Sequence, residues 1–213
     1  MNSEKLLMRR QLISCVSLMV GLAATSFSVA ADEAYRAYNE PAATYLRQFA
    51  KKSGRVFVLE RFDSDGRLVD RTVDEIQGDV LIDSATDRTI AGRKIRLRGL
   101  EACPTEKVIY NRMQTWSCQD AAKDYAGTIY NHRASVVLCK TLLLSNQAEE
   151  TIPASCFILV GGDGEPFRTV YDDDSMVFLG IASIGRTADG QSRRLDLEGT
   201  QALSQSMGFQ NAD

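Results

Sequence analysis

Apolar and basic residues alternate in the middle of the chain, and this alternation is the clearest structural signal in the sequence. Ile95 and Leu97 fall on one face of an extended backbone. Lys94, Arg96 and Arg98 fall on the other. A period of two is typical of a strand with one buried face. The pattern therefore predicts a half-buried strand whose outer face is basic.

Neighbouring segments predict the elements around this strand. Apolar residues at helical spacing favour one long helix after it, and the runs that follow are β-rich. Glycine and proline residues mark the turns between them. The predicted strands are residues 78–82, 89–99, 134–139 and 156–160, and the predicted helix is residues 108–132.

Two elements are predicted ahead of this region. Residues 32–52 carry apolar side chains at helical spacing, with Pro41 as a break or a restart. Residues 55–62 alternate as a strand, and residues 67–73 return as its hairpin partner. The turn Asp63-Ser64-Asp65-Gly66 favours a solvated hairpin turn. A calcium loop is the rival interpretation, but the later carboxylates that such a loop needs do not follow at the required positions.

The N-terminus has the parts of a secretory signal. Basic residues precede an apolar core at residues 12–24, and Ser28-Val29-Ala30 supplies small residues for cleavage. The apolar run is short for a spanning helix. We therefore expect residues 1–30 to be a signal peptide, and the mature chain to be periplasmic or secreted with no membrane span.

Lipidation at Cys15 is an alternative for this segment. Leu12-Ile13-Ser14-Cys15 is similar to a lipoprotein cleavage box. The apolar region, however, follows Cys15 rather than preceding it. This order favours cleavage near Ala30 over a lipid anchor.

The charge of the mature chain argues against one class of function. Without residues 1–30 the chain keeps 22 basic and 27 acidic side chains, a formal charge of −5. Proteins that coat nucleic acid without specificity are basic. The chain is therefore not expected to be one of them.

Four cysteines remain after residue 30, an even number that favours two disulfides in an oxidising compartment. Cys139 ends a predicted strand and Cys156 begins the one that returns beside it, so the two can face each other. That pairing leaves Cys103 for Cys118. Zinc is the rival interpretation, but the sequence has no Cys-x-x-Cys and its only histidine is His132.

Three motifs around the central strand resemble the staphylococcal-nuclease-like (thermonuclease) family. They are Ile95-Arg96-Leu97-Arg98-Gly99-Leu100-Glu101-Ala102, then Trp116-Ser117-Cys118 with Ala121 and Ala122, and Val137-Leu138-Cys139. The resemblance implies an α+β fold, a small five-stranded OB-like β-barrel with packed helices at residues 79–210. The helix and hairpin at residues 31–78 precede this barrel. The resemblance also implies helices at residues 175–183 and 193–208.

The resemblance names candidate catalytic residues, but several family positions are altered. Arg96 keeps one family arginine, and Glu101 stands where the family has an aspartate. The general-base position falls on Pro104, and Glu106, two residues away, is the only candidate to replace it. Arg96, Glu101 and Glu106 are therefore the candidate catalytic residues, in a degenerate form.

The metal-binding turn of the family is altered as well. Ser84 and Thr86 occupy the positions of its two aspartates, and Asp83 and Asp87 each lie one residue off. In a strand, such an offset turns a side chain to the opposite face. In the family, the loop that corresponds to residues 140–155 carries a second arginine. In this sequence that loop contains no arginine. Because calcium takes six to eight oxygen ligands, we expect no metal and no cofactor.

These observations lead to one interpretation and two alternatives. The chain is interpreted as an exported, catalytically inactive nuclease-like protein that acts as a periplasmic binding or assembly module. It is otherwise an active calcium-dependent nuclease with a rearranged site, or an envelope or exopolysaccharide accessory protein that binds a sugar polymer. Exposed aromatic side chains at Tyr110, Trp116 and Tyr125 would favour the sugar polymer, whereas packing of an amphipathic helix is the simpler explanation for them.

The predicted ligand-binding residues are Lys94, Arg96 and Arg98, because they form a basic face on an acidic protein. The expected partner is an anionic polymer or an envelope protein. The alternative is that these side chains pair with aspartates and glutamates of neighbouring strands.

Overall fold

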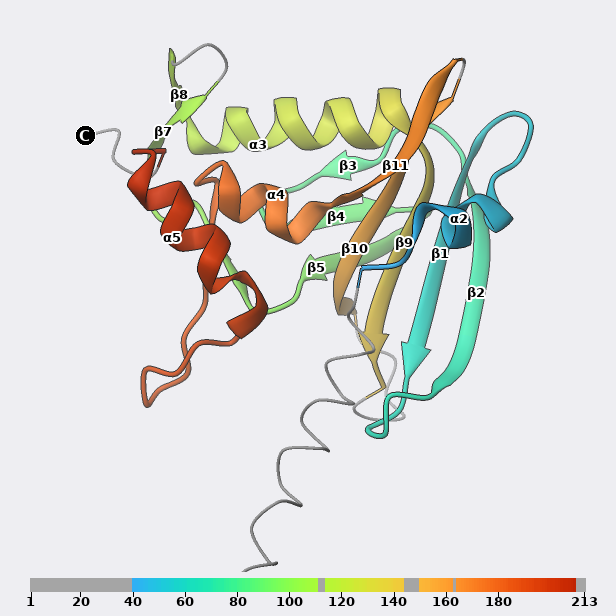
Figure 1. Ribbon diagram of the computed structural model, residues 1–213, viewed down its shortest axis with the longest axis horizontal. Helices are drawn as coiled ribbons and strands as arrows, with labels where there is room; N and C mark the ends of the chain where they lie inside the picture. The colour runs from blue at the N-terminus through green and yellow to red at the C-terminus, as the bar shows by residue number, and fades with distance from the viewer. Residues whose placement is uncertain (1–39, 111–113, 144–149, 163, 210–213) are drawn as a thin grey trace, which may run out of the picture.

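Twelve strands and four α-helices make up the described part of the chain, a mixed α+β fold with a mostly sheet core (Figure 1). The computed structural model describes residues 40–110, 114–143, 150–162 and 164–209. The predicted signal peptide, with Cys15, lies outside these residues.

The main sheet has the strand order β2-β1-β9-β10-β5-β4-β3, and β11 pairs with β10 as well. β10 pairs antiparallel with β9 and parallel with β5. Its strands are β1 (Arg55–Phe62), β2 (Leu68–Ile76), β3 (Leu81–Ile82), β4 (Asp87–Ile90), β5 (Arg93–Leu97), β9 (Ala134–Leu142), β10 (Thr151–Gly162) and β11 (Glu165–Tyr171).

Two small sheets and the helices complete the fold. The small sheets pair β6 (Leu100–Ala102) with β12 (Ala182–Ile184), and β7 (Lys107–Tyr110) with β8 (Gln114–Ser117). The helices are α2 (Ala43–Leu46), η1 (Arg47–Phe49), α3 (Cys118–Gly127), η2 (Thr128–Arg133), α4 (Asp172–Phe178), η3 (Leu195–Leu197) and α5 (Glu198–Ser206).

The main sheet stays open in the described residues and does not close into the expected five-stranded barrel. Its end strands, β2 and β3, do not pair with each other in the described residues. Strand β9 pairs antiparallel with β10 on one edge and in parallel with β1 on the other. The hairpin β1–β2 is therefore continuous with the main sheet.

The strand predicted at residues 89–99 is in fact a hairpin of β4 and β5. Ala91 and Gly92 form its turn, with φ values of 49° and 78°. Positive φ at both turn residues matches the twist of a tight hairpin. Within β5 the predicted alternation is confirmed, since Ile95 is fully buried and Lys94 is exposed.

The helix predicted at residues 108–132 begins later than expected. Strands β7 and β8 take its first part, where residues such as Val108 and Trp116 favour an extended backbone. Helix α3 starts after Ser117, whose Oγ accepts a hydrogen bond from the backbone amide of Asp120 at 3.1 Å. This N-cap sets the beginning of the helix.

Other predicted elements differ in their ends. The helix expected at residues 175–183 is α4, which starts three residues earlier and is followed by β12. The helix expected at residues 193–208 is the pair η3 and α5. In the described part of residues 32–52, only the short α2 and η1 are helical.

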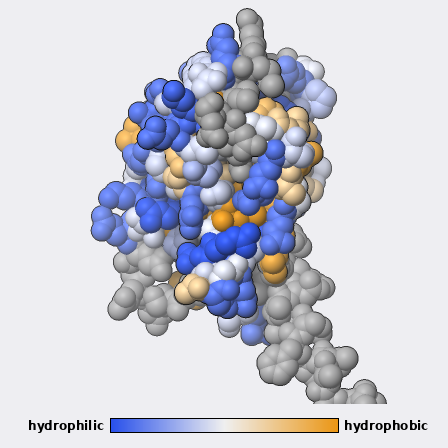
Figure 2. Space-filling model, turned by 90° about the vertical axis from the view of Figure 1, so that its left-hand side faces the viewer, coloured by the Kyte–Doolittle hydropathy of each residue, from blue (hydrophilic) through white to orange (hydrophobic). Residues whose placement is uncertain are grey.

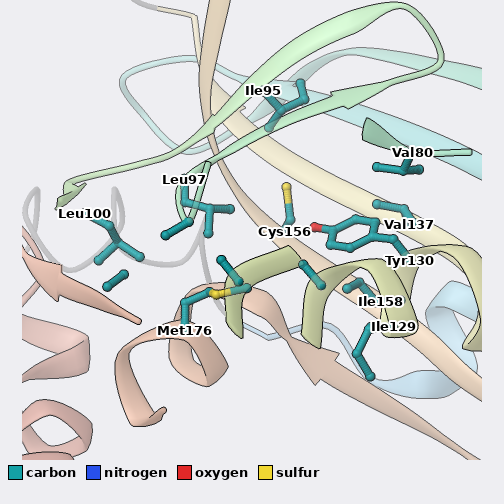
Figure 3. Packing of buried hydrophobic residues seen from close by; sticks show 14 of the residues in the cluster. Val80, Ile95, Leu97, Leu100, Ile129, Tyr130, Val137, Cys156, Ile158 and Met176 are labelled. Carbon is teal, nitrogen blue, oxygen red and sulfur yellow. The ribbon is translucent and has the colours of Figure 1, made fainter. Parts of the chain in front are cut away.

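The main core gathers apolar side chains from β5, α3, η2, β9, β10 and α4 (Figure 3). Helix α3 contributes mostly small ones, and Ala121, Ala122 and Ala126 are fully buried. Small residues let a helix lie close to the elements that it covers. A second cluster packs Leu46 of α2 against Val58 of β1 and neighbouring strands.

Two disulfides cross-link the fold with the expected pairing, Cys103–Cys118 and Cys139–Cys156. Cys139 and Cys156 lie directly opposite each other in the β9–β10 pair. The other disulfide joins the loop after β6 to the first residue of α3. Both therefore link segments that are adjacent in space but separate in sequence.

The surface seen from the side of α5 is largely hydrophilic, and hydrophobic colour is confined to limited areas (Figure 2). Exposed apolar side chains here are Leu195 of η3, Leu203 of α5 and Met207, which directly follows α5. Among the described helices, none is long and apolar enough to cross a membrane.

Candidate functional site

Arg96 and Asp87 form an ion pair across the β4–β5 hairpin. They are direct partners in the antiparallel register. The Arg96 Nε atom lies 2.7 Å from Asp87 Oδ1, and 59% of the Arg96 side chain is exposed. Cross-strand partners share a face of a sheet, so Asp87 points toward the candidate site. Of the two flanking aspartates, Asp87 is thus the one that faces Arg96, whereas the next side chain, Arg88, is buried.

Ser84 and Thr86 hold the same carboxylate. Ser84 Oγ donates to Asp87 Oδ2 at 2.6 Å, and Thr86 Oγ1 does so at 3.3 Å. Burial by itself raises the pKa of Asp87, but the hydrogen bonds from Ser84 and Arg96 and the Arg96 charge outweigh it and lower the pKa. Asp83 bonds elsewhere, to a threonine of β4. The turn thus supplies one carboxylate, already bonded, to Arg96.

The other two side chains of the basic face, Lys94 and Arg98, also lie near acidic side chains. Lys94 Nζ lies 3.0 Å from Glu150 Oε1, and both side chains are mostly exposed. Arg98 is half-buried after β5. Burial raises the pKa of Asp196, but Arg194 and then Arg98 lower it overall. For Lys94 and Arg96 the structure therefore has the acidic pairing that the sequence left as an alternative.

Glu101 and Glu106 are exposed and lie on other elements than Arg96. Glu101 is in β6, opposite Ser183 of β12. Glu106 precedes β7, and its backbone carbonyl accepts a hydrogen bond from the Cys118 amide at 2.8 Å. Across the described residues, no hydrogen bond or ion pair joins either carboxylate to Arg96, and no group of three His, Cys, Asp or Glu side chains is placed to hold a metal.

A buried ion pair on the interior side of β4 fixes the turn that carries Asp87. Arg88 of β4 and Asp172 of α4 are both almost completely buried, with Nη2 and Oδ2 3.2 Å apart. Tyr130 Oη donates to the same oxygen at 2.8 Å. Arg88 Nη1 also donates to the backbone carbonyl of Ser84 at 2.8 Å. This network ties the turn to the start of α4.

A second buried ion pair holds the far end of β5. Arg194 and Asp173 are both fully buried and are bonded through Nη1 and Oδ2. Arg194 Nη1 also donates to the backbone carbonyl of Arg98 at 2.9 Å, and Nε donates to Asp196 at 2.9 Å. Burial lowers the pKa of Arg194, but the carboxylates of Asp173 and Asp196 outweigh this and raise it. The guanidinium therefore stays charged.

Sequence reasoning missed both buried pairs. The available signal was the run Asp172-Asp173-Asp174 directly after a strand. Aspartate is seldom fully buried unless it is paired. The first two members are anchors for the two ends of the β4–β5 hairpin, and Asp174 instead accepts a hydrogen bond from Thr200 at 2.5 Å.

Two of the aromatic residues named from the sequence are half-buried and pack against the main core, Trp116 in β8 and Tyr125 in α3. The side chain of Tyr110 lies outside the described part. Core packing therefore accounts for much of the surface of Trp116 and Tyr125. Tyr125 also lines a hollow beside α3.

Comparison with known proteins yields no family model that matches this chain, and no curated protein matches it either.

Proposed function

We propose that this protein is an exported binding module that does not cleave its ligand, built on a degenerate nuclease-like domain. The motif run at residues 95–102 supports the family resemblance. The OB-like relation to the family is part of this proposal, with a main sheet that is open in the described residues. Its ligand is an anionic polymer, and an envelope protein is the alternative partner.

The observation that carries the proposal is the Arg96–Asp87 ion pair. Nuclease chemistry on a phosphate needs positive groups that neutralise the developing charge, and a metal held by several oxygens. Here the retained arginine is already neutralised by a carboxylate 2.7 Å away. That carboxylate in turn accepts hydrogen bonds from Ser84 and Thr86, at the two positions where the family has aspartates.

Glu101 and Glu106 support the same conclusion. Both belong to a segment that the Cys103–Cys118 disulfide ties to α3. Glu101 is further fixed by its position in the β6–β12 pair. A general base must come within hydrogen-bond reach of the water it activates, and in the described residues neither carboxylate is bonded to Arg96, whose partner is Asp87.

Binding by the basic face is compatible with its ion pairs. Exposed ion pairs contribute only about 0–1 kcal/mol. An anionic polymer can therefore replace the exposed Glu150 at Lys94 with little loss. Because these contacts are electrostatic, such binding weakens as salt rises.

Export rests on two features. The N-terminal segment has the parts of a signal peptide. The two disulfides are typical of an oxidising compartment, which fits a periplasmic or secreted location.

A working nuclease remains the second candidate, because Asp87 faces Arg96 and provides one carboxylate at the expected place. That reading needs calcium and a further set of oxygen ligands. Glu101 and Glu106 are the residues that it would recruit.

The experiment uses a fluorescent single-stranded oligonucleotide as the anionic probe and measures its affinity across a salt series. The double variant Arg96→Gln/Arg98→Gln is expected to weaken binding and flatten the salt dependence. Arg67→Gln, which removes an exposed arginine from the β1–β2 turn, is the matched control. Equal affinities for all three proteins would exclude β5 as the binding face.

A further inference from the structure

A hollow of about 460 Å³ opens beside α3, and we call it the β11 hollow. This volume is within the range of small-ligand sites. It is bounded by the end of α3 and η2, by β11 and by the first turn of α4. Its lining residues are Glu40, Tyr125, Ile129, Arg133, Arg168, Thr169, Val170, Tyr171, Asp174 and Ser175.

Two arginines in the β11 hollow differ from those of the neighbouring strands. Every basic side chain of β1, β2, β4 and β5 is in an ion pair. Arg133 at the end of η2 and Arg168 in β11 are exposed. Neither guanidinium forms an ion pair or a hydrogen bond with the described residues. The hollow therefore presents two arginines that have no direct partner among the described residues, together with the carboxylates of Glu40 and Asp174.

An anionic group in the hollow can accept charge-assisted hydrogen bonds from these guanidiniums. The planar fork of arginine matches a carboxylate with two parallel hydrogen bonds. The strongest single feature of a ligand for this hollow is therefore an anionic group.

The remaining lining suits hydroxyl groups. Asp174 offers carboxylate oxygens, and Glu40 offers another carboxylate. Burial raises the pKa of Tyr125, so its phenol remains protonated at neutral pH and can donate a hydrogen bond. Its half-buried ring also provides an apolar surface. Carboxylates that accept from hydroxyls, beside an aromatic ring, are a combination that fits a sugar.

We propose that the β11 hollow binds an acidic sugar, a uronic acid unit of an oligosaccharide. Arg133 and Arg168 hold its carboxylate, and Asp174 and Tyr125 bond its hydroxyls. The hollow shares no residue with the basic face of β5. The proposal therefore stands or falls independently of polymer binding at Arg96 and Arg98.

The test is titration calorimetry of the purified exported protein with a galacturonic acid trimer. A neutral galactose trimer and inorganic phosphate are titrated in parallel. Saturable binding of the acidic trimer is expected, with much weaker binding of the neutral trimer and of phosphate. Arg133→Gln and Arg168→Gln are each expected to lower the affinity about tenfold or more, because each removes a charge-assisted hydrogen bond.

Lys123→Gln is the control, because it removes an exposed charge from α3 without touching the hollow. Arg168→Lys keeps the charge but loses the fork, and it is expected to bind with intermediate affinity. Since both arginines are exposed, all variants should melt close to the unchanged protein.

Four results would overturn the proposal. They are no saturable binding of the acidic trimer, equal binding of the neutral trimer, phosphate binding as tight as that of the trimer, and a loss in Lys123→Gln as large as in the arginine variants. Equal binding of the neutral trimer would mean that the carboxylate is not recognised. Tight binding of phosphate would mean that the hollow binds any small anion. A large loss in Lys123→Gln would mean that the acidic trimer is held by general electrostatic attraction.

Discussion

Asp87 and Arg96 lie directly opposite each other on antiparallel strands, with Oδ1 and Nε 2.7 Å apart. Two buried ion pairs hold the hairpin that carries them. Arg88 of β4 reaches Asp172, and Arg194, which bonds to the Arg98 carbonyl, reaches Asp173. The first turn of α4 therefore fixes both ends of the candidate site.

Removal of the Asp87 carboxylate is expected to strengthen anion binding at β5. In Asp87→Asn the guanidinium of Arg96 loses its counter-charge and is available to a ligand. The affinity for the oligonucleotide should rise several-fold at low salt, and this gain should disappear in Asp87→Asn/Arg96→Gln. Fluorescence anisotropy measures both. A weaker affinity in Asp87→Asn would show that the carboxylate itself takes part in binding.

The stability contribution of Asp87 is expected to depend on pH. Its pKa is lowered in the folded protein, so its contribution is fully present above the unfolded value of about 3.9 and is lost as pH falls through the folded value. Urea unfolding of the unchanged protein and of Asp87→Asn should differ modestly at pH 7. The difference should fade below about pH 4. A difference that grows on acidification would reverse the sign of this linkage.

The buried pair at Asp173 is expected to matter far more than an exposed one. Asp173→Asn removes one of the two carboxylates that pair with the buried Arg194 and leaves Asp196 as the other, at a cost of about 3 kcal/mol in the free energy of unfolding. Asp70→Asn is the matched control, because Asp70 pairs with Arg61 at the surface. Its cost should be about 0–1 kcal/mol. Similar losses in urea titrations of the two variants would contradict the structural role of Asp173.

The disulfide between Cys103 and Cys118 closes a loop of 15 residues. The chain-entropy estimate for such a loop is about 3 kcal/mol. Cys103→Ser/Cys118→Ser should therefore lose about that much stability in urea unfolding. Peptide mapping without reduction checks the pairing in the exported protein. A Cys118–Cys139 link would contradict the observed pairing of β9 with β10.

Local patterns predicted much of this fold. The alternation around Ile95 and Leu97 placed β5 and its buried face, because burial of every second side chain leaves a direct mark on the sequence. The hairpin β1–β2 and both disulfides followed from turn residues and from the order of the strands. Strand β11 was not predicted.

Contacts between distant segments were beyond local patterns. The parallel pairing of β1 with β9 joins residues about eighty positions apart. Arginine is usually a surface residue, so the sequence does not indicate that Arg88 and Arg194 are buried. Only the folded chain brings Asp172 and Asp173 to them. The orientation of Asp87 likewise depended on the Ala91–Gly92 turn, which splits one predicted strand into two.

Cleavage of single-stranded DNA by the purified exported protein is the most direct measurement of whether the domain is a binding module or a nuclease. The labelled strand is incubated with calcium, with a chelator, and with the Glu101→Ala variant, and its length is read on a gel. We predict that the strand keeps its full length with calcium, as it does with chelator. Calcium-dependent cleavage that chelator abolishes and Glu101→Ala removes would contradict the proposal and establish a nuclease.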